Sequence, residues 1–239
     1  MKYIYGPVDS RRLGLSLGIS IIPHKTCNFD CLYCQLGRTA TSVNIRKEYV
    51  DIEEALCELK TWLKDNAAAA EKLRYLTISG SGEPTLNIKI GQLIAEIKKI
   101  TPIAVAVITN GSLLSDPQAR QDLLRADLVV PSLDAAEEAA FARIDRPHPQ
   151  IKLEQVIDGL AAFRKEFRGK IWLEVMLVAG VNDAPAQIKK LKEVIDKINP
   201  DKIQLNSPVR CTAEKNILPV KKEKFEKFRE ILGDKCEVV

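Results

Sequence analysis

Long hydrophobic runs are absent from this sequence. The longest apolar stretches, such as residues 103–108, are far shorter than the roughly 20 residues that a membrane helix needs. Residues 1–8 lack the apolar core of a secretory signal, so we expect a cytoplasmic protein. Repeats, low-complexity tracts and interdomain linkers are also missing. These absences favour a single domain over residues 1–239, with residues 1–16 as a lead-in and 207–239 as a C-terminal segment.

A strong excess of one charge is lacking too. The formal net charge is only +4, a value compatible with a nucleic-acid partner but no evidence for one. With 46% hydrophobic and 28% charged residues, the composition is that of an ordinary globular protein with material for one sizeable core.

Cysteine is scarce, and half of it is concentrated in one segment. Cys27, Cys31 and Cys34 form a C-x3-C-x2-C triplet with no fourth cysteine nearby. A structural zinc site needs four ligands, whereas three thiolates on a cubane iron–sulfur cluster leave one iron open for chemistry. The same spacing also fits one face of an amphipathic helix. A zinc site would need a distant fourth ligand, for which the candidates are His24, Cys57, Cys211 and Cys236.

Strand-like and helix-like segments alternate along the chain, which predicts a parallel sheet with helices packed outside it. Six such units predict an α/β fold in the form of a partial (β/α)6 TIM-like barrel, with a doubly wound open sheet as the second choice. The predicted strands cover residues 17–22, 73–79, 103–109, 128–133, 171–178 and 202–206. The predicted helices cover residues 51–66, 88–100, 116–125, 151–167, 185–198 and 221–232.

Unusual residues gather where the predicted strands end. In parallel α/β folds the active site forms from the loops at the carboxyl ends of the strands, so we expect these residues to share one site. They are the cysteine loop, the segment 79–85 with sequence SGSGEPT, the segment 109–112 with sequence TNGS, Ser132, Asp134, Glu174 and Asn206.

Taken together, these motifs resemble those of radical S-adenosylmethionine (SAM) enzymes. The triplet matches that superfamily's C-x3-C-x-aromatic-C signature, with Tyr33 as the aromatic residue. Gly80, Ser81, Gly82 and Glu83 resemble its glycine-glycine-glutamate motif, with Ser81 in place of one glycine. Segments 6–14 and 144–148 are similar to a group of Fe–S oxidoreductases related to wyosine tRNA-base synthetases. The resemblance covers nearly the whole chain.

The resemblance implies an enzyme with a 4Fe-4S cluster held by Cys27, Cys31 and Cys34. In this superfamily the amino and carboxylate groups of SAM bind the open iron. One electron from the reduced cluster then cleaves the cofactor to methionine and a 5′-deoxyadenosyl radical, which abstracts hydrogen from a substrate. An external reductant such as flavodoxin or ferredoxin is implied.

The resemblance also implies cofactor contacts, although a turn, a helix cap or a buried structural partner is the alternative at each position. The carbonyls of Gly80, Ser81 and Gly82 would accept bonds from the SAM ammonium, assisted by the Glu83 carboxylate. Tyr33 would contact adenine. Ribose, adenine or the methionine moiety would be contacted by Asn110, Ser132, Asp134, Glu174 and Asn206.

Substrate contacts are predicted less directly. Arg143, Arg146 and His148 could bind an anionic substrate, as could Arg11 and Arg12, and Cys211 could act near the mouth of the barrel. A tRNA base, a protein (as for glycyl-radical activating enzymes) and a small metabolite remain open as substrates, and a non-enzymatic zinc or iron–sulfur protein is a further alternative. The sequence lacks the additional upstream cysteines of a wyosine synthetase. An uncapped short barrel favours a macromolecular substrate.

Overall fold

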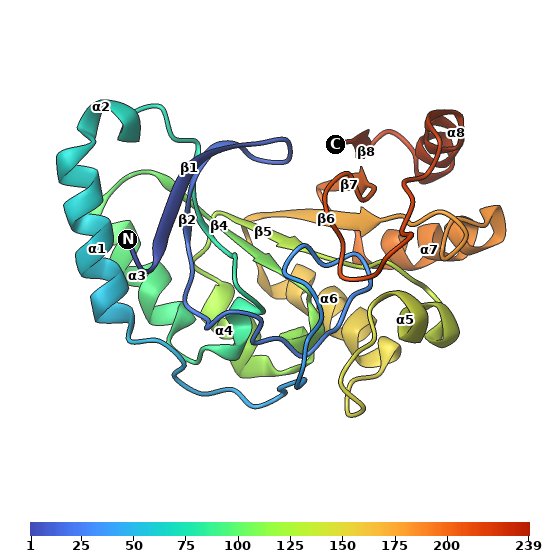
Figure 1. Ribbon diagram of the computed structural model, residues 1–239, viewed down its shortest axis with the longest axis horizontal. Coiled ribbons are helices and arrows are strands. Elements are labelled where there is room, and N and C mark those ends of the chain that lie inside the picture. The colour runs from blue at the N-terminus through green and yellow to red at the C-terminus, as the bar shows by residue number, and fades with distance from the viewer.

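One eight-stranded sheet with helices on its outer side forms the molecule, and the computed structural model describes residues 1–239 (Figure 1). The strands are β1 (Ile4–Ser10), β2 (Gly14–Ile19), β3 (Tyr75–Ile78), β4 (Ala104–Thr109), β5 (Leu128–Pro131), β6 (Lys170–Met176), β7 (Lys202–Asn206) and β8 (Cys236–Val238). They lie side by side in the order of the sequence. Only β1 and β2 are antiparallel, and every other neighbouring pair is parallel.

Helices connect the parallel strands and cover the outer face of the sheet. They are α1 (Ile52–Asp65), α2 (Ala67–Ala70), α3 (Ile90–Ile100), α4 (Pro117–Leu123), α5 (Glu138–Ile144), α6 (Leu153–Glu166), α7 (Pro185–Ile198) and α8 (Lys222–Leu232). The sheet curves without closing, because β1 and β8 remain at its two edges. The predicted α/β partial barrel is therefore confirmed. None of the helices is long and apolar enough to span a bilayer.

All six predicted strands and all six predicted helices are present. The structure adds strands β1 and β8, helices α2 and α5, and two 3-10 helices, Pro84–Leu86 and Ser112–Ser115. The lead-in contains β1, whose side chains are mostly exposed, so it carries little of the alternation that marks a half-buried strand. Strand β8 has three residues, α2 four and α5 seven. Elements this short contain too few turns or alternations for a periodic pattern to be recognised.

Two apolar cores lie on opposite faces of the sheet. The larger one contains 53 buried residues and fills the space between the sheet and the helices. Helix α1 shows how the sequence builds this core, because Ile52, Leu56 and Leu59 recur at helical spacing and are all buried. The smaller one lies inside the barrel and consists of Leu13, Ala106, Leu128 and Val130. This inner core leaves the carboxyl ends of the strands free for a site.

The tip of the β1–β2 hairpin spans the open side of the barrel. Figure 1 shows the hairpin (blue) reaching from the β2 edge towards β7 and β8. Leu13 at the tip is only 2% exposed and belongs to the inner core. The Arg12 guanidinium forms an ion pair with Glu174 of β6, and the Gln204 side chain of β7 donates to the Arg12 carbonyl oxygen at 3.1 Å. The tip thus connects the hairpin side of the sheet to β6 and β7, with which it forms no strand pairing.

We expect the substitution Leu13→Ala to loosen the hairpin tip. Removing a buried leucine side chain typically lowers the free energy of unfolding by about 2–5 kcal/mol. In a domain of this size each kcal/mol corresponds to a decrease of roughly 2–4 °C in Tm, measurable by thermal unfolding. Val8→Ala on the same hairpin, where the side chain is 37% exposed, is the matched control. Equal effects of the two substitutions would show that the tip is not packed against the inner core.

Candidate functional site

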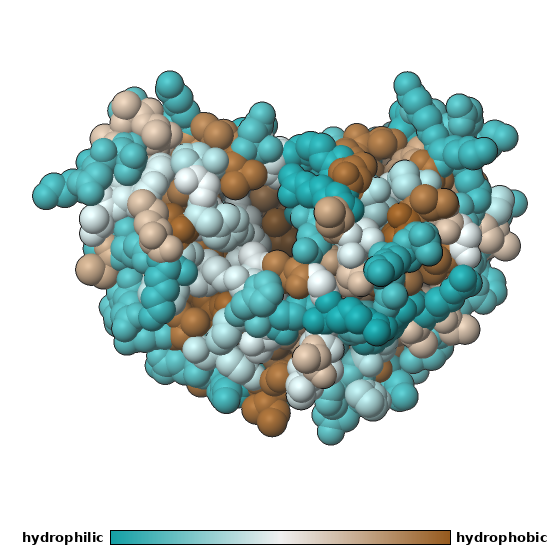
Figure 2. Space-filling model, in the orientation of Figure 1, coloured by the Kyte–Doolittle hydropathy of each residue, from teal (hydrophilic) through white to brown (hydrophobic).

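A cleft of about 450 Å³ lies inside the barrel, at the carboxyl ends of the strands. It extends from the cysteine loop to the hairpin tip, and Figure 2 shows the surface hollowed beside that tip. The predicted site residues that line it are Cys27, Tyr33, Cys34, Gly80, Gly82, Glu83, Asn110, Ser132, Glu174 and Asn206. Residues from six different strand ends therefore meet in one space.

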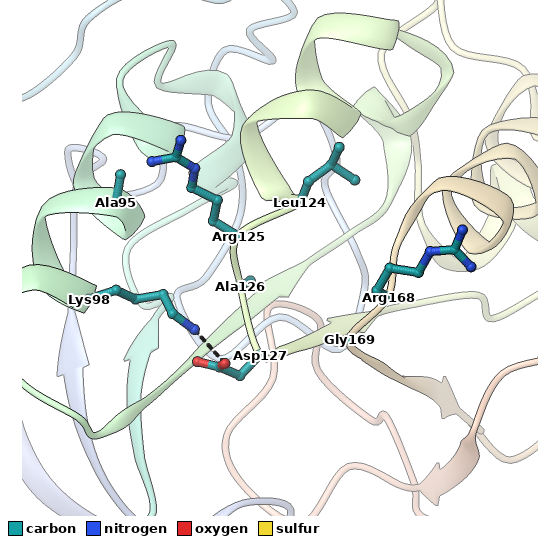
Figure 3. Close-up of a pocket in the computed structure, with 8 residues that line it drawn as sticks. All are labelled: Ala95, Lys98, Leu124, Arg125, Ala126, Asp127, Arg168 and Gly169. Atoms are coloured by element: carbon teal, nitrogen blue, oxygen red, sulfur yellow. Dashed lines mark hydrogen bonds and ion pairs between the residues drawn. The ribbon is translucent and has the colours of Figure 1, made fainter.

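A second hollow, of about 540 Å³, lies at the opposite end of the strands (Figure 3). Lys98 points to the Asp127 carboxylate there, with 2.5 Å between Nζ and Oδ1, while Arg125 and Arg168 point away from it. None of the strand-end motifs contributes to its lining. The cleft that contains the cysteines is therefore the candidate site.

The cysteine loop is held against the glycine loop by backbone contacts. Thr26 forms a bridge with Gly82, in which the Glu83 amide donates to the Thr26 carbonyl oxygen at 3.0 Å. The Lys25 amide donates to the Ser81 carbonyl oxygen at 2.5 Å. A Cβ added at Gly82 would overlap the Thr26 carbonyl group, so only glycine permits this approach. The predicted functional glycine thus also positions the cysteines.

Nitrogen donors surround the cysteine sulfurs that face the cleft. Lys25 Nζ lies 2.9 Å from Cys34 Sγ, and the Phe29 amide nitrogen lies 3.4 Å from Cys27 Sγ. Asn110 Nδ2 lies 3.8 Å from Cys27 Sγ. Burial raises the pKa of Cys27 to about 12, so the free thiol holds its proton. A bound cationic centre would favour the thiolate instead, and the donors would stabilise it.

The three thiols have the chemistry of iron–sulfur cluster ligands. A mononuclear zinc site would need four ligands around a common centre, whereas a cluster places each thiolate on a separate iron. Of the four distant candidates for a fourth ligand, His24, Cys57 and Cys211 are exposed and Cys236 is buried in β8. The donor set of Cys27, Cys31 and Cys34 suits a cluster with three protein ligands.

Glu83 is buried and uses its carboxylate to hold the loop after β4. Its Oε1 accepts from the Thr85 amide at 3.0 Å, from the Thr85 hydroxyl at 2.6 Å and from the Thr109 hydroxyl at 2.7 Å. Its Oε2 accepts from the Asn110 amide at 2.7 Å. Burial raises the Glu83 pKa, and these bonds oppose that rise. One lone pair of Oε2 remains for a ligand in the cleft.

Asn110 connects the end of β4 to the cysteine loop. Its Nδ2 donates to Asn28 Oδ1 at 2.7 Å, and its Oδ1 accepts from the Ser112 amide at 3.0 Å. Asn28 is fully buried between the cysteines and donates in turn to Ser112 Oγ at 2.8 Å. Sequence reasoning missed Asn28, although an amide inside the cysteine triplet was a visible signal. Asn110 therefore both lines the cleft and holds the cysteine loop against the end of β4.

Tyr33 and two aspartates form a buried cluster beneath the cleft. The Tyr33 hydroxyl donates to Asp134, whose Oδ1 accepts from the Met176 amide at 2.7 Å. Asp145 lies 3.5 Å from Cys31, measured from Oδ1 to Sγ. Burial raises the pKa of Asp134 to about 7 and that of Asp145 well above its usual range. Asp134 does not line the cleft, so the structure gives it the role of orienting Tyr33.

The predicted substrate residues do not line the cleft, with two exceptions on the hairpin. Arg11 and Arg12 line it, and Arg11 donates to Asn206 Oδ1 at 3.5 Å. Arg146 instead pairs with Glu214 at 2.6 Å, which ties the C-terminal segment to the cysteine loop region. Outside the lining are Cys31, Ser81, Asp134, Arg143, Arg146, His148 and Cys211. Lys25 and Thr77 line the cleft but were not predicted. Thr77 lies between the buried residues Leu76 and Ile78 of β3. Ser79, from the predicted segment 79–85, also lines the cleft.

Comparison with known proteins identifies relatives of the whole chain. The model of the radical SAM superfamily matches residues 21–191. A protein named GTPase Obg from Brachyspira hyodysenteriae is 42% identical over 99% of this chain, which spans 34% of that protein's length. A UPF0026 protein from Methanocaldococcus jannaschii is 37% identical, with 98% of this chain and 73% of that protein covered. The crystal structure of a radical SAM methyltransferase from Sphaerobacter thermophilus shares the fold, with a TM-score of 0.69, 16% identity, and 94% of this chain and 65% of that chain covered.

Gly82→Ala should displace the cysteine loop, because the added methyl group would overlap the Thr26 carbonyl group. We expect at least a tenfold lower yield of bound iron and sulfide after anaerobic reconstitution, measured by metal analysis and visible absorbance. Ser81→Ala is the control, because its side chain only accepts one bond, from Ser20 Oγ at 2.9 Å. If Gly82→Ala takes up iron as the control does, the close contact is not essential to the loop.

Glu83→Ala should destabilise the cluster-free protein. The buried amide of Thr85 and the half-buried amide of Asn110 would lose their acceptor, and an unsatisfied buried group costs about 1–3 kcal/mol. Glu83→Gln should cost less, since its amide oxygen can still accept from Thr85 and Thr109. Urea unfolding measures the free energy of unfolding of both variants, and the surface substitution Glu96→Ala is the control. An effect of Glu83→Ala no larger than that of the control would contradict the anchoring role.

Proposed function

This chain belongs to the radical SAM superfamily and is an enzyme of that kind, and we propose that it acts on a group projecting from a macromolecule into the cleft. Members of the superfamily use a 4Fe-4S cluster and SAM. When bound, these two cofactors supply reductive C–S bond cleavage and the radical that abstracts hydrogen from the substrate. The protein's own task is to bind, orient and shield the reacting groups.

Each part of the cleft lining has its own role in this proposed function. Cys27, Cys31 and Cys34 would hold the cluster, with Lys25 and the Phe29 amide as donors to the sulfurs. The backbone of the glycine loop would receive the cofactor's ammonium group, which can also reach the free lone pair of Glu83 Oε2. The contacts of Tyr33, Asn110, Ser132, Glu174 and Asn206 with the nucleoside part of the cofactor remain part of this proposal.

The volume of the cleft carries the argument for a macromolecular substrate. Pockets for a single ligand measure about 300–1,000 Å³, and this cleft of about 450 Å³ lies near the lower end of that range. A nucleoside cofactor uses much of such a space. What remains suits one side chain or base that enters from outside while the rest of its molecule stays on the surface. We therefore favour an RNA base or a protein side chain over a free metabolite.

An external electron donor completes the proposal. The chain has one cysteine triplet, and its other three cysteines, Cys57, Cys211 and Cys236, stand singly in the sequence. A flavodoxin- or ferredoxin-like protein would supply the electron. All six thiols are free of disulfides, which suits a reducing compartment such as the cytoplasm.

Replacement of Cys27, Cys31 and Cys34 by alanine should abolish both the cluster and the reaction. The anaerobically reconstituted protein, given dithionite and SAM, should form 5′-deoxyadenosine, measured by chromatography and mass spectrometry. We expect the triple variant to form at least about a hundredfold less. Cys57→Ala is the matched control, because this thiol is exposed on α1. A reconstituted protein that makes no deoxyadenosine, or a triple variant that still does, would refute the proposed function.

A further inference from the structure

One end of the cleft is built by the hairpin and contains neither the cysteine triplet nor the glycine loop. Its lining includes Ser10, Arg11 and Arg12 from the hairpin tip, Ser16 from β2 and Thr77 from β3. The cysteine and glycine loops line the other end. If the cofactors occupy the loop end, the hairpin end is the part of the cleft left for the substrate.

Positive charge exceeds negative charge in this lining. The cationic side chains are Lys25, Arg11, Arg12 and Arg210, against the two carboxylates of Glu83 and Glu174. Glu174 is already engaged, since it pairs with Arg12 and accepts from Asn206 Nδ2 at 3.1 Å. A cleft lined with one sign of charge concentrates ligands of the opposite sign.

Two of these guanidinium groups have no carboxylate side chain as a partner. Arg11 donates to Asn206 Oδ1 at 3.5 Å and to the main-chain oxygen of Val239, the last residue of the sequence, at 3.2 Å, which leaves further N–H groups of its guanidinium without an acceptor. Arg210, on the segment after β7, donates to Gln35 Oε1 at 3.2 Å. Neither pairs with an aspartate or a glutamate, in contrast to Arg12. Both therefore remain able to bind an anion.

A buried hydroxyl group on the same wall also lacks a partner. Thr77 is only 4% exposed, and its Oγ1 is buried without a hydrogen bond. Ser16, on the neighbouring strand, is 5% exposed. An unsatisfied buried hydroxyl is unfavourable, so this position is suited to a ligand that brings an acceptor.

We infer that the hairpin end of the cleft binds a phosphate group of the substrate through Arg11 and the hydroxyls of Thr77 and Ser16. Arg210, beside Gln35 of the cysteine loop, would face the same substrate from the other end of the cleft. Guanidinium groups bind phosphate with two parallel hydrogen bonds, and phosphate offers enough acceptor oxygens for the hydroxyls as well. This inference rests on the proposed function. The phosphate would belong to a phosphodiester of RNA or to a free nucleotide, which share this chemistry.

Binding of two phosphate probes to the reconstituted protein tests the inference without measuring turnover. The probes are a fluorescently labelled single-stranded RNA and a nucleoside 5′-monophosphate, titrated anaerobically with SAM present. Arg11→Gln combined with Arg210→Gln should weaken binding at least about tenfold. For RNA, the slope of log K against log salt concentration should fall by about 0.7 for each phosphate that the variant no longer binds.

The second hollow supplies a control with the same change of charge. Arg125→Gln combined with Arg168→Gln removes two exposed guanidinium groups that have no hydrogen-bond or ion-pair partner, at the opposite end of the strands (Figure 3). This control should bind both probes as the unmodified protein does. The substitution in the hairpin could disturb folding, so Arg210→Gln is also tested alone, because it lies on an exposed segment. It should weaken binding of the probes at least about threefold.

The outcomes separate the two proposals. Weaker RNA binding only in the cleft variants supports the inference. If the cleft variants bind only the nucleoside monophosphate more weakly, and the RNA as before, the phosphate site is supported and its ligand is a small substrate. Three outcomes would overturn the phosphate inference. The cleft and control variants could weaken probe binding equally, the cleft variants could lose affinity for SAM in place of the probes, or an acidic peptide could bind more tightly than either probe. Deoxyadenosine formation by the unmodified protein tests the proposed function independently.

Discussion

The close approach of two loops is the constraint on which the candidate site depends. Thr26 and Gly82 pair through their backbones, at a distance that leaves no room for a side chain on residue 82. This contact fixes the start of the cysteine loop relative to the glycine loop. Glu83, the next residue, fixes the loop after β4 with its buried carboxylate. Three strand ends are therefore positioned relative to one another by two adjacent residues, and Cys27 and Cys34 line the cleft as a consequence.

The hairpin has an equivalent role on the other side of the cleft. A sheet of this size that does not close leaves an open side, and the tip fills it with Leu13 in the inner core and Arg12 against Glu174. Because side chains and not strand pairing make this connection, the tip can place polar groups inside the barrel. Arg11 owes its position beside Asn206 to this geometry. The same device therefore completes the fold and supplies cationic groups to the cleft.

The sequence predicts those features that arise from local patterns or from a distinctive motif. Helical spacing located α1, and the C-x3-C-x2-C triplet located the metal-binding loop. The hairpin strand β1 escaped prediction because its side chains are mostly exposed. Whether Arg11 or Arg146 reaches the cleft depends on packing between segments far apart in the chain. Local sequence contains no information on the Glu214 carboxylate that engages Arg146.

The distribution of acids around the site explains why the cleft is electropositive in a nearly neutral chain. Asp134 and Asp145 lie beneath the cleft, where burial raises their pKa values and favours the neutral form. Glu83 directs most of its acceptor capacity into the protein, and Glu174 is neutralised by Arg12. The carboxylates are thus used to hold loops, while Arg11 and Arg210 donate to amide and backbone oxygens. An overall charge of +4 conceals this separation, which only the folded arrangement reveals.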